Sequence, residues 1–278
     1  SPKDLFRVLD DHCEPYEVHG VVADKEWMFK AYEEAAYPES DKEWEMGFGN
    51  WLDFARHSPA KIKEPVFIPP SPIIGNTVGF ASTYDRVEMD VDVNVRHLVS
   101  QLLSPVQRHP HESTSVLLKE METLLRGKTT TEGERFYLVG PGRRTPIQLE
   151  ADGIKVLATL ERLISVGVLV PGTCLYWDEP EAHLNPSLMD EVVKAIWMLA
   201  RSGIQIFLAT HSYLILKELE VQSVPRDHLK FFALEKTDEG TRVHEASRYL
   251  DIAPNLIEAQ YGSLLDRAFV KEFGERTE

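Results

Sequence analysis

Apolar residues recur at two different spacings along the chain, and these spacings predict a mixture of helices and strands. Val91 to Leu103 has apolar residues three and four positions apart, as does Ser113 to Leu125, so both segments are predicted helices. Lys63 to Pro70 contains a short apolar run stopped by two prolines, which is typical of a buried strand. Arg135 to Val139 and Thr145 to Leu149 are strand-like, and the Gly-Pro-Gly turn between them predicts a hairpin.

The pattern is clearest after residue 150. Ile154 to Ile164 has the apolar face of a helix, and Thr173 to Trp177 is predicted to be a buried strand. Asn185-Pro186 is typical of a helix start, and that helix should end near Arg201. Ile204 to Ala209 is predicted to be the next buried strand. A strand, a helix and a strand with short links form a βαβ unit, so the predicted fold class is α/β with a mainly parallel core sheet flanked by helices.

Polar side chains follow both strands of this unit. Asp178 and Glu179 come directly after the first strand, and Thr210 and His211 come directly after the second. Because ligands of open α/β sheets lie outside the carboxyl ends of the strands, these side chains should meet at one edge of the sheet. The sequence therefore predicts a site there.

The chemistry of this site is suited to phosphoryl transfer to water. Asp178, closest to the strand end, suits a magnesium ion held through water, since Mg²⁺ dehydrates reluctantly. Glu179 suits the orientation and deprotonation of the attacking water. His211 can hydrogen-bond a terminal phosphate or that water. Taken alone, an Asp-Glu pair is as often a helix cap, and a single histidine is more often structural.

These segments resemble a known family. Leu175-Tyr-Trp-Asp-Glu-Pro-Glu181 resembles the Walker B strand of ABC ATPases, Ala182-His-Leu-Asn-Pro186 resembles their D-loop, and Ala209-Thr-His-Ser212 resembles their switch-histidine segment. Together they are most similar to the SMC-like prokaryotic "AAA family" ATPases, which include DNA-repair and anti-phage defence ATPases. The usual Leu-Asp of the D-loop is Leu-Asn here. The resemblance implies an ABC/SMC-like P-loop ATPase head that uses ATP and Mg²⁺.

A fourth segment occupies the position of the family's signature loop. Leu149-Glu-Ala-Asp-Gly-Ile-Lys155 opens a predicted helix, although it departs from the usual Leu-Ser-Gly-Gly. In the family this loop contacts the γ-phosphate bound by a second subunit, and free N–H groups at a helix start suit an anion. Gly153 would permit close backbone approach, and Asp152 is expected to cap the helix. The residues assigned to nucleotide contact by the resemblance are Ala151, Asp152, Gly153, Lys155, Asn185 and Thr210.

The family's Walker A loop, Gly-x-x-x-x-Gly-Lys-Ser/Thr, is not visible in the sequence. Gly127-Lys128-Thr129 lacks the first glycine, because residue 122 is Glu122, and Gly140 to Thr145 lacks it as well. Both segments are interpreted as turns. The favoured hypothesis is a chain that lacks the first strands and the phosphate loop, and the alternative is a naturally degenerate member. Residues 1–64 are interpreted as a remnant of the ATPase lobe or an insertion, and residues 65–278 as the ATPase domain.

Composition narrows the possible partners. The 278 residues have 43% apolar side chains and a formal net charge of −15, which lowers the expectation of unaided DNA binding without excluding it. Two cysteines form no disulfide framework, and no apolar run is long enough to span a membrane, so a cytoplasmic protein is expected. The expected partners are a second ATPase subunit and a separately encoded effector.

Three functional hypotheses follow. The first is an ATPase module that dimerises on ATP and controls an effector in DNA repair or anti-phage defence. The second is a scaffold that retains the fold without turnover. The third, which we consider the weakest, is a metal-dependent nuclease that uses Asp178, Glu179 and Glu181. Tyr213 to Leu219 and the last thirty residues are further predicted helices, and Leu229 to Leu234 and Thr241 to His244 are predicted strands.

Overall fold

The computed structural model describes residues 16–22, 25–31, 63–87, 92–238 and 240–273. The chain divides into two compact units, Ser1–Lys63 and Glu64–Glu278. In the first unit, β1 (Tyr16–Val22) pairs with β2 (Lys25–Ala31) as an antiparallel hairpin. The rest of residues 1–62 lies outside the described residues, so the interpretation of residues 1–64 stays a prediction.

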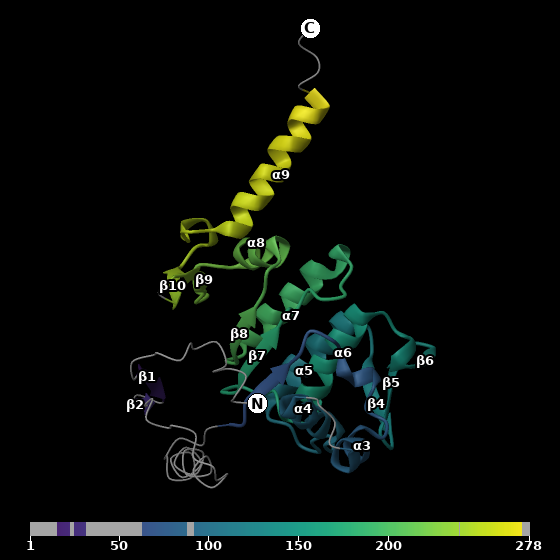
Figure 1. Ribbon diagram of the computed structural model, residues 1–278. Coiled ribbons are helices and arrows are strands. Elements are labelled where there is room, and N and C mark those ends of the chain that lie inside the picture. The colour runs from purple at the N-terminus through teal and green to yellow at the C-terminus, as the bar shows by residue number, and fades with distance from the viewer. Residues whose placement is uncertain (1–15, 23–24, 32–62, 88–91, 239, 274–278) are drawn as a thin grey trace. The chain divides into compact units, whose positions relative to one another are not determined.

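The centre of the second unit is a three-stranded parallel sheet (Figure 1). Its order is β3 (Val66–Ile68), β7 (Cys174–Asp178) and β8 (Gln205–Ala209). The β7 and β8 strands are aligned so that Asp178 pairs with Ala209, the last residue of each. The predicted βαβ unit with adjacent parallel strands is therefore confirmed, and the carboxyl ends of both strands lie at the same edge.

One face of this sheet is buried and the other is partly open. Leu175 and Trp177 of β7 are 0% and 2% exposed, because they point into the main hydrophobic core. Tyr176 and Phe207 point the other way, stack with ring centroids 4.9 Å apart, and are 43% and 44% exposed. The prediction that Ile204 to Ala209 forms a buried strand is wrong for this face. Side chains alternate across a strand, and the described residues leave these two rings uncovered.

The helices that cover the buried face supply most of the core. They are α4 (Val93–Leu103), α5 (Glu112–Leu125), α6 (Asp152–Ser165) and α7 (Met189–Arg201), and their apolar residues form one cluster with the inner face of the sheet. Helix α6 lies in the middle of this layer and is buried over most of its length. It ends before Gly167, whose φ of +78° reverses the chain.

A second, antiparallel sheet has the order β4 (Lys128–Glu132), β5 (Arg135–Gly140) and β6 (Arg143–Pro146). The predicted hairpin is present, but the second strand stops at Pro146, and Ile147–Leu149 form the 3₁₀ turn η2. Proline has no N–H for the ladder, and Ile147 turns into the core. The predicted turn at Gly127-Lys128-Thr129 is also wrong, because β4 begins at Lys128.

The remaining elements complete the unit. They are η1 (Ile73–Gly75), α3 (Phe80–Val87), η3 (Pro186–Leu188), α8 (Tyr213–Gln222), β9 (Phe231–Thr237), β10 (Gly240–Ala246), η4 (Tyr249–Asp251) and α9 (Leu256–Phe273). The β9 and β10 strands form an antiparallel hairpin. Among the described residues, no helix has the length and apolar character needed to cross a membrane.

Candidate functional site

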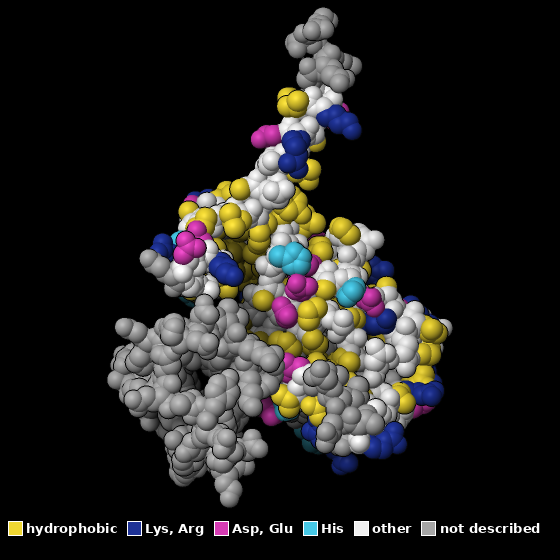
Figure 2. Space-filling view, viewed as in Figure 1, with side chains coloured by type: hydrophobic (Ala, Val, Ile, Leu, Met, Phe, Trp, Pro, Cys, Tyr) yellow, Lys and Arg dark blue, Asp and Glu magenta, His cyan; other side chains and the backbone are white. Residues whose placement is uncertain are grey.

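The candidate site lies where β7 and β8 end. Asp178 is the last residue of β7, and the N–H of Glu179 donates to the carbonyl of Ala209 at 2.8 Å. This bond extends the β7–β8 pairing by one residue and fixes the start of the loop after β7. Figure 2 shows acidic and histidine side chains together in this part of the surface, with hydrophobic side chains around them. The edge predicted from the sequence is therefore the place where these residues gather.

The loop after β7 begins with a strained residue. Glu179 has a φ of +43°, in the left-handed region that non-glycine residues rarely adopt. Such a conformation costs on the order of 1–3 kcal/mol and persists where surrounding bonds enforce it. Here the Ala209 carbonyl binds the Glu179 N–H, and the Glu179 carbonyl accepts from the Ala182 N–H at 2.9 Å. The result is a turn that directs the Glu179 side chain, 41% exposed, toward His211.

His211 reaches back from the second strand to two carboxylates. Its Nδ1 lies 3.3 Å from Oε1 of Glu179 and 3.7 Å from Oε1 of Glu181. The His211 side chain is 75% exposed, so it can also turn toward a ligand. The structure thus brings Asp178, Glu179 and His211 to one edge of the sheet, and their catalytic roles stay predictions.

The sequence interpretation gave no role in the ATPase site to Glu181. Its Oε1 accepts a hydrogen bond of 2.7 Å from Oγ1 of Thr210, and its side chain is only 9% exposed. In this structure Thr210 uses its hydroxyl to join the two loops of the site, and its assigned contact with nucleotide stays a prediction. The signal in the sequence is a second glutamate after Pro180, facing a hydroxyl at the end of the neighbouring strand. Its spacing alone did not distinguish it from a solvated loop residue.

Negative charge accumulates at Asp178. Partial burial raises the pKa of its carboxyl, and the nearby charges of Glu179 and Glu181 raise that pKa further. A cation at this position would relieve both effects, so the donor set fits a magnesium ion. Among the described residues, no group of three or more His, Cys, Asp or Glu side chains is arranged to hold a metal alone. One carboxylate with water and phosphate oxygens is the usual way in which Mg²⁺ is bound.

The proposed signature loop leads into helix α6. Ala151 is the N-cap residue, and its carbonyl accepts from the N–H groups of Ile154 and Lys155. Asp152 does not cap the helix, contrary to the prediction, because it lies inside the first turn. Its carboxylate accepts a hydrogen bond of 2.8 Å from Nζ of Lys155 instead. The two charged side chains assigned to nucleotide contact are therefore bound to each other in this conformation.

Gly153 has a packing role that the sequence did not reveal. It is buried, and a Cβ at this position would lie 2.5 Å from Cδ1 of Leu188 and 3.3 Å from Cδ2 of Leu184. Leu184 belongs to the segment that resembles the D-loop, and Leu188 lies in η3 directly after it. Gly153 therefore allows the start of α6 to pack against that segment. This contact joins the proposed signature loop to the loop that follows the carboxylates.

The D-loop segment ends as the sequence predicts. Oδ1 of Asn185 accepts from the N–H of Ser187 at 3.0 Å, and Pro186 occupies the first position of the turn. This turn is the 3₁₀ segment η3, and α7 follows from Met189. Asn185 thus acts as a cap in the structure, and its assigned contact with nucleotide stays a prediction.

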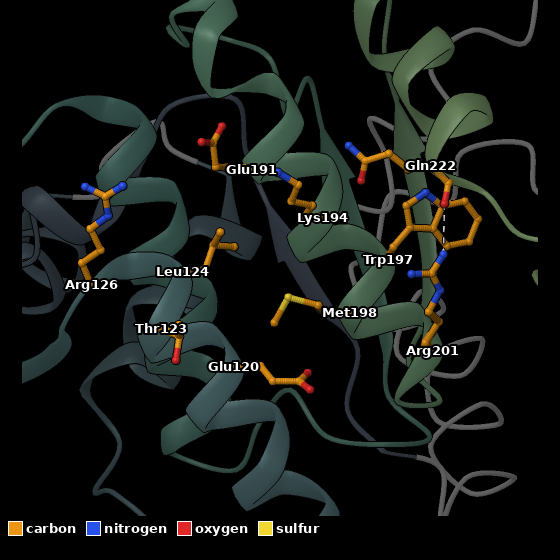
Figure 3. Close-up of a pocket in the computed structure, with 10 residues that line it drawn as sticks. All are labelled: Glu120, Thr123, Leu124, Arg126, Glu191, Lys194, Trp197, Met198, Arg201 and Gln222. Carbon is orange, nitrogen blue, oxygen red and sulfur yellow. Dashed lines mark hydrogen bonds between the residues drawn. The ribbon is translucent and has the colours of Figure 1, made fainter.

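A groove of about 440 Å³ lies away from these residues. It runs between α5 and α7, and Gln222 of α8 closes one end (Figure 3). Two of the basic side chains that line the groove already form ion pairs. Lys194 pairs with Asp190 at 2.6 Å, and Arg201 pairs with Asp227 at 2.8 Å. None of the predicted site residues lines it, so we assign the candidate site to the sheet edge.

A family model matches the part of the chain that contains the candidate site. The family model described as "AAA domain, putative AbiEii toxin, Type IV TA system" matches residues 70–217, which is more than half of the 278 residues. This range includes the signature-like loop, the carboxylates and His211. None of the curated proteins matches the chain.

Solved structures of SMC heads resemble the chain at low identity. An SMC head bound to the C-terminal winged-helix domain of ScpA has a TM-score of 0.45 and 12% identity, and covers 80% of this chain and 64% of its own. An SMC head domain from Thermotoga maritima has a TM-score of 0.36 and 14% identity, and covers 65% of this chain and 53% of its own. The chain thus spans less than two thirds of both structures. By its family match, the chain belongs to the AAA-domain family described as putative AbiEii toxins of type IV toxin–antitoxin systems.

Proposed function

We propose that this chain is the hydrolytic part of an ATP-driven switch, with Glu179 as the base that activates water. The main support is the convergence of Glu179 and His211, 3.3 Å apart, from the ends of two adjacent parallel strands. A general base must be within hydrogen-bond reach of the proton that it removes, and Glu179 is exposed enough to meet a bound water. The left-handed backbone at this residue holds the side chain over the strand ends.

The residues around Glu179 have complementary roles in this proposal. Asp178 would hold Mg²⁺ through water, and the ion would supply charge neutralisation on the phosphates. Glu179 takes the proton of the attacking water, and His211 donates a hydrogen bond to the developing negative charge. His211 lies 3.3 Å from Glu179 in this structure, so its imidazole is within reach of the water and phosphate on which Glu179 would act.

We propose further that two copies act together. The start of α6 has free backbone N–H groups, and such groups suit the γ-phosphate held by a second subunit. Gly153 and Leu188 would pass a shift of that helix to the loop after the carboxylates. Closure on ATP and opening on hydrolysis would then drive a separate effector. In this proposal the effector acts in defence against phage or in DNA maintenance.

The decisive experiment measures ATP turnover by the full-length native protein with magnesium. Glu179→Gln should lower kcat by roughly a hundredfold or more and leave ATP binding intact, because the amide cannot accept the proton. Asp178→Asn should instead weaken magnesium-dependent ATP binding. Glu120→Gln, on the exposed face of α5, is the control that should change neither. Equal and negligible effects at Asp178 and Glu179 would contradict the proposal. A native protein without turnover would favour a scaffold.

A further inference from the structure

Glu181 occupies an unusual position beside the proposed catalytic residues. Its side chain is 9% exposed, yet its Oε2 is buried and has no hydrogen-bond partner among the described residues. Only Oε1 is engaged, by the hydroxyl of Thr210 at 2.7 Å, with His211 Nδ1 at 3.7 Å. No Lys or Arg pairs with this carboxylate within the described part of the chain. Glu181 is therefore a buried carboxylate with half of its hydrogen-bonding capacity unused.

Stability alone does not favour such a residue. A buried carboxylate oxygen without a donor costs free energy, on the order of 1–3 kcal/mol or more for a charged group. A glutamine could accept the same hydrogen bond from Thr210 without the charge. The carboxylate at position 181 thus opposes folding, and unsatisfied buried groups of this kind are concentrated at functional sites.

The hydrogen bond between Glu181 and Thr210 is the first of a series of hydrogen bonds that ends at the start of helix α8. Oγ1 of Thr210 donates to Glu181 and accepts from the N–H of Ser212 at 3.0 Å. Oγ of Ser212 then caps α8 by accepting from the N–H of Ile215 at 3.4 Å. His211 lies between Thr210 and Ser212, so both of its neighbours are fixed by this chain. The backbone that presents the imidazole to Glu179 is held in this way from the loop after β7.

We propose that Glu181 is a positioning residue that acts through Thr210 to place His211 against Glu179. It links the ends of β7 and β8 through side chains, beyond the last backbone pair at Asp178 and Ala209. Glu181 itself touches neither the attacking water nor the phosphates in this scheme. Its effect on the reaction therefore belongs to the catalytic step and not to nucleotide binding. The inference rests on the proposed function, because His211 and Glu179 are the groups that it places.

The first test is steady-state ATP hydrolysis by the full-length native protein. Glu181→Ala and Thr210→Val should each lower kcat by about tenfold or more and leave KM for ATP within about twofold, since a positioning bond affects the transition state. Glu181→Gln and Thr210→Ser retain an acceptor and a hydroxyl and should keep most of the turnover. The double variant Glu181→Ala/Thr210→Val should be no slower than the slower single variant, because both remove one bond.

Glu191 provides a matched control, since it also has a buried carboxylate oxygen without a partner but lies on α7, away from the site. Glu191→Ala should leave kcat unchanged. If Glu181→Ala does not fold, Thr210→Val against Thr210→Ser still tests the bond. Additive effects in the double variant, or wild-type kcat in Glu181→Ala, would overturn the inference while Glu179→Gln still tests the proposed function.

A second readout needs no turnover. The ring nitrogen resonances of His211, followed by NMR without nucleotide, should move in Glu181→Ala and Thr210→Val but not in Glu191→Ala. A protein that does not hydrolyse ATP but shows these shifts would contradict the proposed function and leave the positioning contact intact. Unchanged His211 resonances in both variants would overturn the contact itself.

Discussion

Two buried glutamates of this protein lie in opposite surroundings. Glu161 of α6 is 2% exposed, and its Oε2 accepts hydrogen bonds from both the N–H and the hydroxyl of Thr129 in β4. Its neighbour Arg162, also 2% exposed, donates to the carbonyls of Leu102 and Ser104. The Glu181 side chain is 9% exposed, and its buried Oε2 has no partner within the described residues.

This difference in hydrogen bonding suggests a structural role for the charged groups of α6 and a functional role for Glu181. At α6, buried charged groups bind backbone atoms that would otherwise be unsatisfied, including the last carbonyls of α4. They fasten β4 and α4 to the central helix. At the edge of the parallel sheet, in contrast, the buried Oε2 of Glu181 has no donor among the described residues. Glu181 lies in the loop after β7, which begins with Glu179 in a left-handed conformation. At α6 the hydrogen bonds of Glu161 and Arg162 hold elements of the fold together, whereas Oε2 of Glu181 has no partner among the described residues and remains available to a ligand.

Arg162→Met should show the largest effect on stability. The change leaves the carbonyls of Leu102 and Ser104 without their donor and removes a positive charge next to Glu161. We expect a loss of about 2–5 kcal/mol in the free energy of unfolding, because two buried carbonyls each lose a charged donor. Urea denaturation followed by circular dichroism measures it. Lys119→Met on the exposed face of α5 is the control, and a loss of similar size there would contradict the assignment.

Glu161→Gln should have the next largest effect, and its sign depends on pH. Burial raises the pKa of Glu161 from 4.5 to about 7. The folded state therefore holds this proton more tightly than the unfolded state, so stability is highest below pH 4.5 and falls as pH rises through about 7. Glutamine keeps an acceptor for Thr129 without the charge. The variant should be more stable than wild type by about 1–3 kcal/mol at pH 8.

The pH dependence of the free energy of unfolding distinguishes Glu161→Gln from wild type more clearly than a single measurement at pH 8. Between pH 5 and pH 8, the free energy of unfolding should fall less in Glu161→Gln than in wild type, when both are measured by urea denaturation. Glu120→Gln, an exposed change on α5, should reproduce the wild-type profile. A profile for Glu161→Gln that parallels wild type would mean that Glu161 is not the group responsible.

Gly153→Ala should have the smallest effect. A Cβ would meet Cδ1 of Leu188 at 2.5 Å, but this atom is the end of a flexible side chain. Alanine also favours helix over glycine by about 1 kcal/mol, so we expect a net change in stability of about 1 kcal/mol or less. Leu188→Ala in the same chain should recover any loss. A loss of turnover without a loss of stability would indicate that the contact between α6 and the D-loop segment transmits the nucleotide state.

Much of the fold follows from local patterns in the sequence. The apolar runs at Thr173 to Trp177 and Ile204 to Ala209, with a helix between them, predicted two adjacent parallel strands, and β7 and β8 are paired in that way. Because both strands run in the same direction, their carboxyl ends had to meet. The proximity of Glu179 and His211 was therefore predictable from the sequence.

Other features depend on contacts between distant segments, which local patterns do not encode. The position of the strand that begins at Lys128 depends partly on Thr129, whose N–H and hydroxyl donate to Glu161 of helix α6. The exposure of Phe207 depends on which face of the sheet the helices cover. The link from Glu181 to Thr210 joins loops from two strands, and Gly153 is buried because Leu184 and Leu188 fold back onto it.

The sequence by itself determined the order of the elements, the edge of the sheet where the polar residues gather, and the family resemblance. Periodicity and turn chemistry act over a few residues, and a parallel βαβ unit has a fixed direction. The tertiary structure alone decided which acids are buried and which of their oxygens have hydrogen-bond partners. Burial and hydrogen bonding depend on neighbours brought from elsewhere in the chain, and these neighbours separate Glu161 from Glu181.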